Sequence, residues 1–196
     1  MIGKFLWIID NGHGKATPGK RSPLLDDGRQ LLEYEFNRDI VSRLMALMET
    51  DGLSSHNLVP EVEGDISLSV RVDRANKMQT PLQKLYLSIH ANAAGDEWSN
   101  ANGIETFCFR FASRSERLAK IFQSNLVTTV GWRDRGVKEA DFYVLKYTKM
   151  PAILTENGFY SNPDQCGKLL SPEWRDYIAQ AHLQAIRETE EAGYNF

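Results

Sequence analysis

Three short polar segments carry the residues that could do chemistry in this sequence. They are Asp10-Asn-Gly-His-Gly14, Leu87-Ser-Ile-His-Ala-Asn-Ala93 and Leu154-Thr-Glu-Asn-Gly-Phe159. Each of them ends or follows an apolar, strand-like run. In an open parallel sheet the carboxyl ends of the strands lie along one edge, where ligand crevices form. We therefore expect His13, His90 and Glu156 to converge, although they are far apart in the sequence.

His13 and His90 are the two histidines whose surroundings suit a metal ligand. Glycines flank His13 on both sides, and they allow a sharp bend and a close approach to a ligand. His90 ends an apolar strand and is followed by small residues. Histidines are more often hydrogen-bonded structural residues than ligands, and we expect this of His56 and His182.

A third ligand is needed to complete an open zinc site, and a carboxylate is a usual one. The candidates are Glu33, Glu35 and Asp10. Zinc held in this way keeps a fourth position for water, whose pKa then falls to about 7. Glu33 also has a structural explanation, because an acidic residue stabilises the N-terminus of a helix. Residue types alone leave the third ligand open.

Glu156 is the best candidate for proton transfer. It follows the apolar run Ala152-Ile-Leu154, and a carboxylate at the edge of a core is costly unless it is paired or used. Partial burial raises the pKa of such a group towards the range where it can take and return a proton. A salt bridge, or a backbone clamp for the turn at Asn157-Gly158, is the structural alternative.

The elements that must position these residues alternate between strands and helices. The predicted strands are residues 5–9, 58–59, 85–89, 103–109, 142–145 and 152–155. The predicted helices are residues 33–48, 67–77, 113–130 and 172–190. This alternation predicts an α/β fold, with a mostly parallel twisted sheet of about six strands flanked by helices.

Composition narrows the class of protein. A length of 196 residues suits one domain, and the net charge of −3 does not favour nucleic acid as a partner. The apolar run 5–9 is too short to span a membrane, so we expect no membrane insertion.

The two cysteines cannot form a CxxC site. We expect Cys108 to be a small buried residue, and a disulfide with Cys166 is not required.

Taken in order, the motifs resemble those of the zinc-dependent N-acetylmuramoyl-L-alanine amidases, a family of bacterial cell-wall enzymes and phage endolysins. The resemblance runs from Ile8 to about Ile186. Besides the three segments above, it rests on Glu33-Tyr-Glu-Phe-Asn37, Asp65-Ile-Ser-Leu68 with Arg71, Arg74-Ala-Asn76, Gly103-Ile-Glu-Thr106, Arg135-Gly-Val-Lys138, Phe142-Tyr-Val-Leu145, Pro151-Ala-Ile-Leu154 and Ser161-Asn162. Each motif alone is weak, but all of them in the family's order are specific.

The resemblance implies one zinc ion per chain, held by His13, Glu33 and His90. Glu33 matches the ligand because the family's glutamate stands four residues before an asparagine, here Asn37. The family's catalytic glutamate falls on Glu156, which would act as general acid and base. The implied reaction is hydrolysis of the amide bond between the lactyl group of N-acetylmuramic acid and L-alanine in peptidoglycan.

The sequence departs from the family pattern near the metal and is short in one loop. Asn11 replaces the usual proline, and Lys15 replaces a glycine, so the loop to Glu33 has its own shape. Residues 94–102 leave no room for the insertion that covers the zinc in some members. We therefore expect a permanently open site that needs no activator.

Two other functions compete with this interpretation. One is another zinc peptidoglycan hydrolase, a carboxypeptidase or a deacetylase. The other is a non-catalytic wall-binding module, which would require loss of a ligand or of Glu156, and all four residues are present. We expect residues 1–196 to form one catalytic domain without a separate wall-binding module, acting as a monomer on peptidoglycan. Because no segment resembles a secretory signal, we expect synthesis in the cytoplasm and access to the wall by lysis or another export route.

Overall fold

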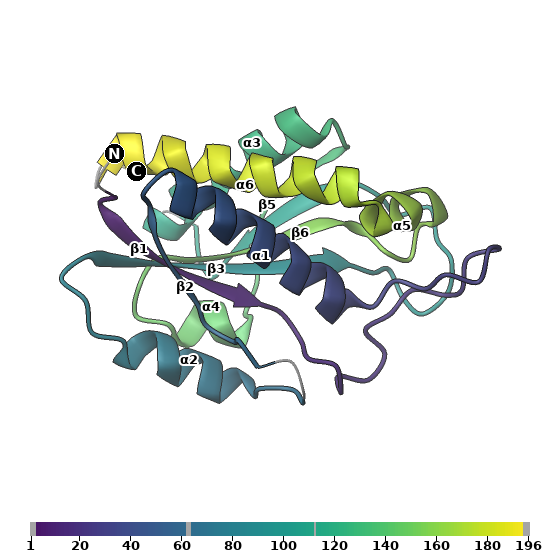
Figure 1. The fold of residues 1–196 in the computed structure, drawn as a ribbon, viewed down its shortest axis with the longest axis horizontal. Helices are drawn as coiled ribbons and strands as arrows, with labels where there is room; N and C mark the ends of the chain where they lie inside the picture. Colours follow the sequence, from purple (N-terminus) through teal and green to yellow (C-terminus); the bar gives the residue numbers. More distant parts are fainter. Residues whose placement is uncertain (1–2, 62–63, 112, 194–196) are drawn as a thin grey trace.

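The computed structural model describes residues 3–61, 64–111 and 113–193, which form one α/β domain (Figure 1). Within these residues, the strands are β1 (Phe5–Asn11), β2 (Ser54–Asn57), β3 (Gln83–Asn92), β4 (Ile104–Cys108), β5 (Asp134–Glu139) and β6 (Ala152–Phe159). The helices are α1 (Glu33–Thr50), α2 (Leu68–Lys77), α3 (Arg114–Val130), α4 (Tyr143–Tyr147), α5 (Pro163–Leu170) and α6 (Pro172–Ala192).

The strands form one six-stranded sheet in the order β2-β1-β3-β6-β4-β5. All neighbouring pairs are parallel except β4 and β6, which are antiparallel. The predicted sheet, mostly parallel with about six strands, is therefore confirmed. The central strands β1, β3 and β6 are rich in apolar residues because helices cover both of their faces.

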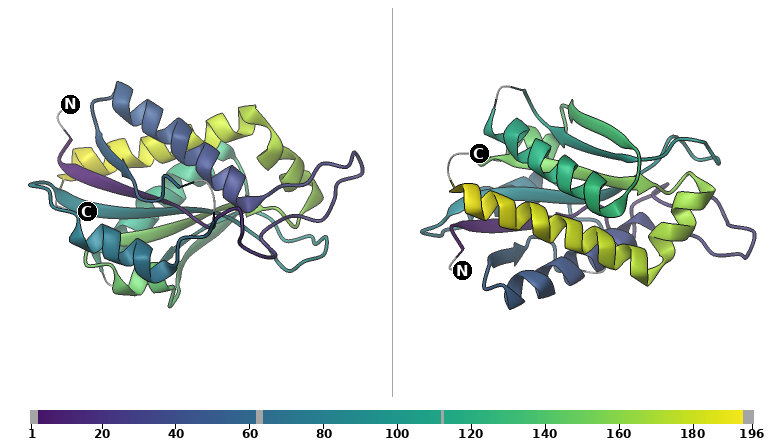
Figure 2. Two further views of the ribbon diagram at one scale, coloured as in Figure 1. Left: turned by 60° about the horizontal axis from the view of Figure 1, so that its bottom comes forward. Right: turned by 90° about the horizontal axis from the view of Figure 1, so that it is seen from above.

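Helices α1, α3 and α6 lie on one face of the sheet, and α2 and α4 lie on the other (Figures 1 and 2). The larger core, which includes Trp7 and Leu87, lies under α1, α3 and α6. The smaller core, which includes Tyr86 and Leu154, lies under α2 and α4. Because successive strand residues point to opposite faces, β3 directs Tyr86 and His90 to the α2/α4 side. The candidate site therefore belongs to that side of the sheet.

Capping residues explain where two of the helices begin. The Ser67 hydroxyl accepts a hydrogen bond from the Val70 amide at 3.4 Å, and the Ser113 hydroxyl accepts one from the Glu116 amide at 3.2 Å. Such caps satisfy amides that have no partner inside the helix. The predicted beginning of the second helix at Ser67 is confirmed. No helix in the described ranges is long and apolar enough to cross a membrane.

The strand predicted at residues 58–59 is wrong. The strand lies just before it, at Ser54–Asn57, and pairs with β1 at the edge of the sheet. An edge strand tolerates the polar sequence Ser-Ser-His-Asn because one of its sides is not paired. Leu58 and Val59 instead fill the smaller core.

The strand predicted at residues 142–145 is also wrong, since residues 143–147 form helix α4. The amides of Leu145 and Lys146 both donate to the Phe142 carbonyl, which closes a helical turn. Val144 and Leu145 are buried while Phe142 and Tyr143 are exposed, a one-sided pattern that four residues could not reveal. Strand β5 and helix α5 were not predicted from the sequence. Both cysteines are free and buried, as expected for Cys108.

Candidate metal centre and active site

His90 and Glu156 are brought together by the pairing of β3 with β6. They are register partners in adjacent parallel strands, so both side chains point to the α2/α4 side of the sheet. His13 follows two residues after the end of β1, the other neighbour of β3. The predicted convergence of these three residues is therefore confirmed.

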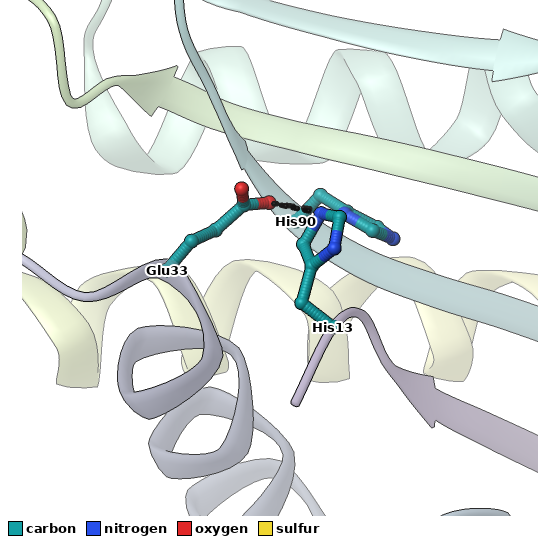
Figure 3. A group of neighbouring side chains, drawn as sticks. All are labelled: His13, Glu33 and His90. Carbon is teal, nitrogen blue, oxygen red and sulfur yellow. Dashed lines mark hydrogen bonds and ion pairs between the residues drawn. The ribbon is translucent and has the colours of Figure 1, made fainter. Parts of the chain in front are cut away.

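Glu33 is the carboxylate beside the two histidines. It is the first residue of α1 and is buried. Its Oε1 lies 3.0 Å from Nδ1 of His90 and 3.3 Å from Nε2 of His13. Figure 3 shows the three side chains turned toward one another, and their potential ligand atoms all lie within 4.8 Å of each other. Glu35 instead is exposed and accepts a hydrogen bond from Tyr34.

The charge state of Glu33 suits a metal ligand. Burial opposes ionisation of the carboxyl, but hydrogen bonds and the charges of His13 and His90 hold the pKa of Glu33 well below its ordinary value. Two imidazoles and one ionised carboxylate are the donor set of open zinc sites. The residues present therefore fit a zinc ion.

The backbone at His13 is held in an unusual conformation. His13 has a φ of 65°, and in the described part of the chain no other non-glycine residue has a positive φ. The preceding residue, Gly12, passes so close to the His90 ring that a Cβ there would lie 2.0 Å from Cε1. Glycine is needed at this position because a side-chain carbon would occupy the space that the His90 ring fills. The Asn37 side chain, one turn into α1 from Glu33, donates to the Gly12 carbonyl at 2.9 Å.

Arg71 of α2 fixes the backbone that carries His13. Its buried guanidinium donates to the His13 carbonyl at 3.1 Å and to the Asp10 carboxylate. The other oxygen of Asp10 accepts hydrogen bonds from the hydroxyls of Tyr86 at 2.9 Å and Ser88 at 2.8 Å. Asp10, one of the three candidate carboxylates, is therefore engaged away from the metal group.

Ser88 also connects this network to His90. Its hydroxyl oxygen lies 3.1 Å from Nε2 of His90, while Nδ1 of the same ring faces Glu33. A hydrogen-bonding partner on the second nitrogen fixes the orientation of a ligating imidazole. Asp10, Arg71 and Ser88 thus orient both histidines without belonging to the donor group.

Glu156 has the environment expected of a proton-transfer group. Its Oε2 is buried and has no hydrogen-bond partner among the residues that the structure describes. Burial, followed by the charges of Glu33 and Glu105, raises the pKa of Glu156 well above its ordinary value. The predicted structural alternatives, a salt bridge or a clamp of the following turn, do not match a carboxylate oxygen without a partner.

One pocket of about 400 Å³ contains the metal group and Glu156. Ile66 and Leu68 at the start of α2, and Phe142 and Tyr143 at the start of α4, form an apolar wall. Of the segment that follows β3, Ala93 lines the pocket, whereas none of the described residues 94–102 does. These residues are held elsewhere, since the amides of residues 94 and 99 donate to the side chain and carbonyl of Ser161.

Sequence reasoning missed Tyr160, which lines the pocket just after β6. Burial, the nearby charges of Glu33 and Glu156, and a hydrogen bond to Glu33 raise the pKa of the Tyr160 hydroxyl. Nothing in the spacing of Tyr160 could have indicated this contact. His56 is exposed on β2, and His182 is buried in α6, so neither joins the group, as expected.

Comparisons with known proteins agree on one family. A family model described as N-acetylmuramoyl-L-alanine amidase matches residues 8–188. The N-acetylmuramoyl-L-alanine amidase LytC of Bacillus subtilis (strain 168) is 38% identical over 183 residues, which are 92% of this chain and 34% of LytC. The chain therefore spans about a third of the length of that relative. The endolysin of Bacillus phage SPP1 is 28% identical, over 95% of this chain and 66% of the endolysin.

A solved structure supports the same relationship. The crystal structure of an N-acetylmuramoyl-L-alanine amidase from Clostridium difficile 630 is similar to this chain with a TM-score of 0.83 and 29% sequence identity. The similarity covers 97% of this chain and 98% of that protein.

Proposed function

The chain belongs to the N-acetylmuramoyl-L-alanine amidase family, and we propose that it cuts the amide bond between the lactyl group of N-acetylmuramic acid and L-alanine in peptidoglycan. In this proposal His13, Glu33 and His90 hold one zinc ion, and Glu156 is the general base and acid.

The observation that carries the proposal is that a metal-binding group lies beside a carboxylate whose buried Oε2 has no hydrogen-bond partner in the described part of the chain. The donor atoms of His13, Glu33 and His90 lie within 4.8 Å of each other, and Glu156 stands beside His90 in the same pocket. A general base must reach the attacking water and keep a pKa near the working pH. The environment of Glu156 supports both requirements.

Zinc held there would polarise the amide carbonyl and lower the pKa of the attacking water. Glu156 takes the proton from that water and returns it to the nitrogen of the departing L-alanine. Ser88 and Asp10 keep the His90 ring in place during these steps. The apolar side chains of Ile66, Leu68 and Phe142 line the pocket beside these reacting groups.

Digestion of purified walls tests the proposal. We expect mass spectrometry to show peptides with a free L-alanine terminus beside intact glycan, and zinc in about equal amount to the protein by elemental analysis. A chelator should stop digestion and added zinc should restore it. Peptides shortened at the carboxyl end would identify a carboxypeptidase, and free glucosamine amines would identify a deacetylase.

A Glu156→Gln variant distinguishes the role of the metal from the role of the proton-transfer group. It should bind zinc as the wild type does and digest walls about 10²- to 10⁴-fold more slowly. Wild-type digestion by this variant would refute the role of Glu156. We also propose that the site is open without an activator, since residues 94–102 are held against Ser161. Strict dependence of wall digestion on a second protein would contradict this.

A further inference from the structure

We propose that Arg135 and Lys138 form a second binding site in this protein, for a carboxylate on the peptide that leaves from the cut bond. Both residues lie on β5, and neither has a part in the proposed chemistry. The inference rests on the proposed amidase function and extends it to the peptide side of the substrate.

A row of charged and polar residues crosses the sheet on the α2/α4 side, from the metal group toward β5. His90 on β3 is opposite Glu156 on β6, and Glu156 is opposite Glu105 on β4. Arg135 and Lys138 on β5 contact Glu105 from the other side. Neighbouring strands are about 4.8 Å apart, so β5 lies roughly 10 Å from β6. Substrate that leaves the metal group along this row reaches the two cations next.

Glu105, Arg135 and Lys138 form a cluster with a net positive charge. The Glu105 carboxylate accepts hydrogen bonds from Arg135 at 2.7 Å, from Asn92 at 2.7 Å and from Lys138. Burial opposes ionisation of Glu105, but the bonds from Lys138 and Arg135 hold its pKa below the ordinary value. Two cations therefore surround one anion, which leaves one positive charge in excess. One cation would have been enough to neutralise Glu105.

Arg135 and Lys138 are held in place but remain partly exposed. The side chain of Arg135 is 26% exposed and that of Lys138 is 38% exposed. The Arg135 guanidinium lies 4.8 Å from the Phe159 ring centroid, and its Nη2 has no hydrogen-bond partner in the described ranges. A guanidinium fixed in this way is prepared to donate to an incoming carboxylate with little loss of freedom.

The direction of the substrate follows from the role of Glu156. Because Glu156 returns a proton to the leaving nitrogen, the peptide begins at Glu156 and extends away from the metal group. Each residue of an extended peptide spans about 3.5 Å, so a carboxylate on the second residue lies roughly 7 Å from the cut nitrogen. The side chains of Arg135 and Lys138 reach back from β5 to the Glu105 carboxylate on β4, about 4.8 Å from β6, which brings both cations within this distance.

The cations that line the pocket itself do not suit this task. Within the described residues that line it, these are Arg71 and Lys20. Arg71 is buried and bound to Asp10. The Lys20 carbonyl accepts from the Glu33 amide at 3.0 Å, and the charge of Lys20 opposes the rise in the pKa of Glu156, so Lys20 lies beside the metal group and the cut bond. Beyond the pocket, on the strand side of Glu156, the cations that contact Glu105 are Arg135 and Lys138.

The test compares purified walls with the same walls whose carboxylates have been converted to carboxamides by carbodiimide and ammonium. We expect the wild type to release L-alanine termini at least about tenfold faster from the untreated walls. Lys138→Met should lose this preference, so that its rates on the two walls are about equal, and Lys138→Arg should restore the preference. Lys120→Met, which removes an exposed lysine on α3, is the matched control and should behave as the wild type.

A second measurement locates the carboxylate. L-alanyl-D-isoglutamate should inhibit wall digestion at least about tenfold more strongly than L-alanyl-D-isoglutamine, and Lys138→Met should remove the difference. Equal inhibition by the two peptides, or an unchanged wall preference in Lys138→Met, would overturn the inference. Failure of the proposed function is recognised separately, because neither wall would then yield L-alanine termini with the wild type.

Discussion

Replacing Gly12 with alanine tests how closely the metal group depends on the approach of two chain segments. A Cβ at this position would lie 2.0 Å from Cε1 and 2.2 Å from Nε2 of His90. Carbon atoms in contact are about 3.5 Å apart or more, so the ring and the Gly12 backbone would have to separate by roughly 1.5 Å. The ring cannot simply turn away, because Glu33 and Ser88 hold its two nitrogens.

Such a displacement affects both binding and rate. Disturbing the partners that orient a metal ligand costs about 10- to 100-fold in metal affinity, and a misplacement of about 1 Å can cost about 10²-fold in rate. We therefore expect Gly12→Ala to bind zinc about 10- to 100-fold more weakly than the wild type. At saturating zinc it should still digest walls about 100-fold more slowly, because the displaced His90 ring would hold the metal out of place relative to Glu156.

Competition with a chromophoric chelator measures the zinc affinity, and the release of L-alanine termini from walls measures the rate. Gly167→Ala in α5 is the control, because a Cβ there meets nothing within 4 Å. That variant should keep the wild-type zinc affinity and gain about 0.5–1 kcal/mol of stability, as alanine does over glycine inside a helix. A Gly12→Ala variant with wild-type affinity and rate would refute the reasoning.

Three further predictions follow from the buried polar groups. Arg71→Lys keeps a charge beside Asp10 but loses the forked contact to the His13 carbonyl, so zinc affinity should fall about 10- to 100-fold by chelator competition. In metal-free protein, Glu156→Gln should raise the free energy of unfolding at neutral pH. The raised pKa of Glu156 makes the folded wild type lose stability as the pH rises above the ordinary pKa of glutamate. Urea titrations at pH 5 and 8 measure this effect, and equal stabilisation at both pH values would contradict it. Burial lowers the pKa of His182 to about 4. Below the ordinary histidine pKa of 6.5, the unfolded chain therefore binds more protons than the folded protein, and the free energy of unfolding decreases as the pH is lowered. Between pH 7.5 and 5 this amounts to about 2 kcal/mol, and His182→Leu should lose that much of the pH dependence of unfolding.

The convergence of His13, His90 and Glu156 was predictable from the sequence because local patterns constrain these three residues strongly. The glycines around His13 and the apolar runs before His90 and Glu156 indicated strand ends at one edge of a parallel sheet, and β1, β3 and β6 are neighbours of that kind. The third ligand was not predictable from residue types. Glu33 and Glu35 are two positions apart on one helix, and only the direction of α1 makes one buried and the other exposed.

The parts that escaped prediction depend on contacts between distant segments. Strand β5, Asp134–Glu139, carries charged residues and a glycine, and it is extended because it pairs with β4 and packs beside Glu105. The orientation of Arg71 toward His13 also requires α2 to lie under the end of β1. Neither the periodicity nor the residue types of these segments contain that information.

The position of β5 at the edge of the sheet has a consequence for protein engineering. The proposed chemistry lies on β3, β6 and α1, where each strand is held by neighbours on both sides, so a change there disturbs several elements at once. Arg135 and Lys138 lie on a strand with one neighbour, where a substitution displaces little else. Substitutions at Arg135 and Lys138 can therefore be used to change the preferred peptide by design, while the hydrolytic residues in the same row keep their positions.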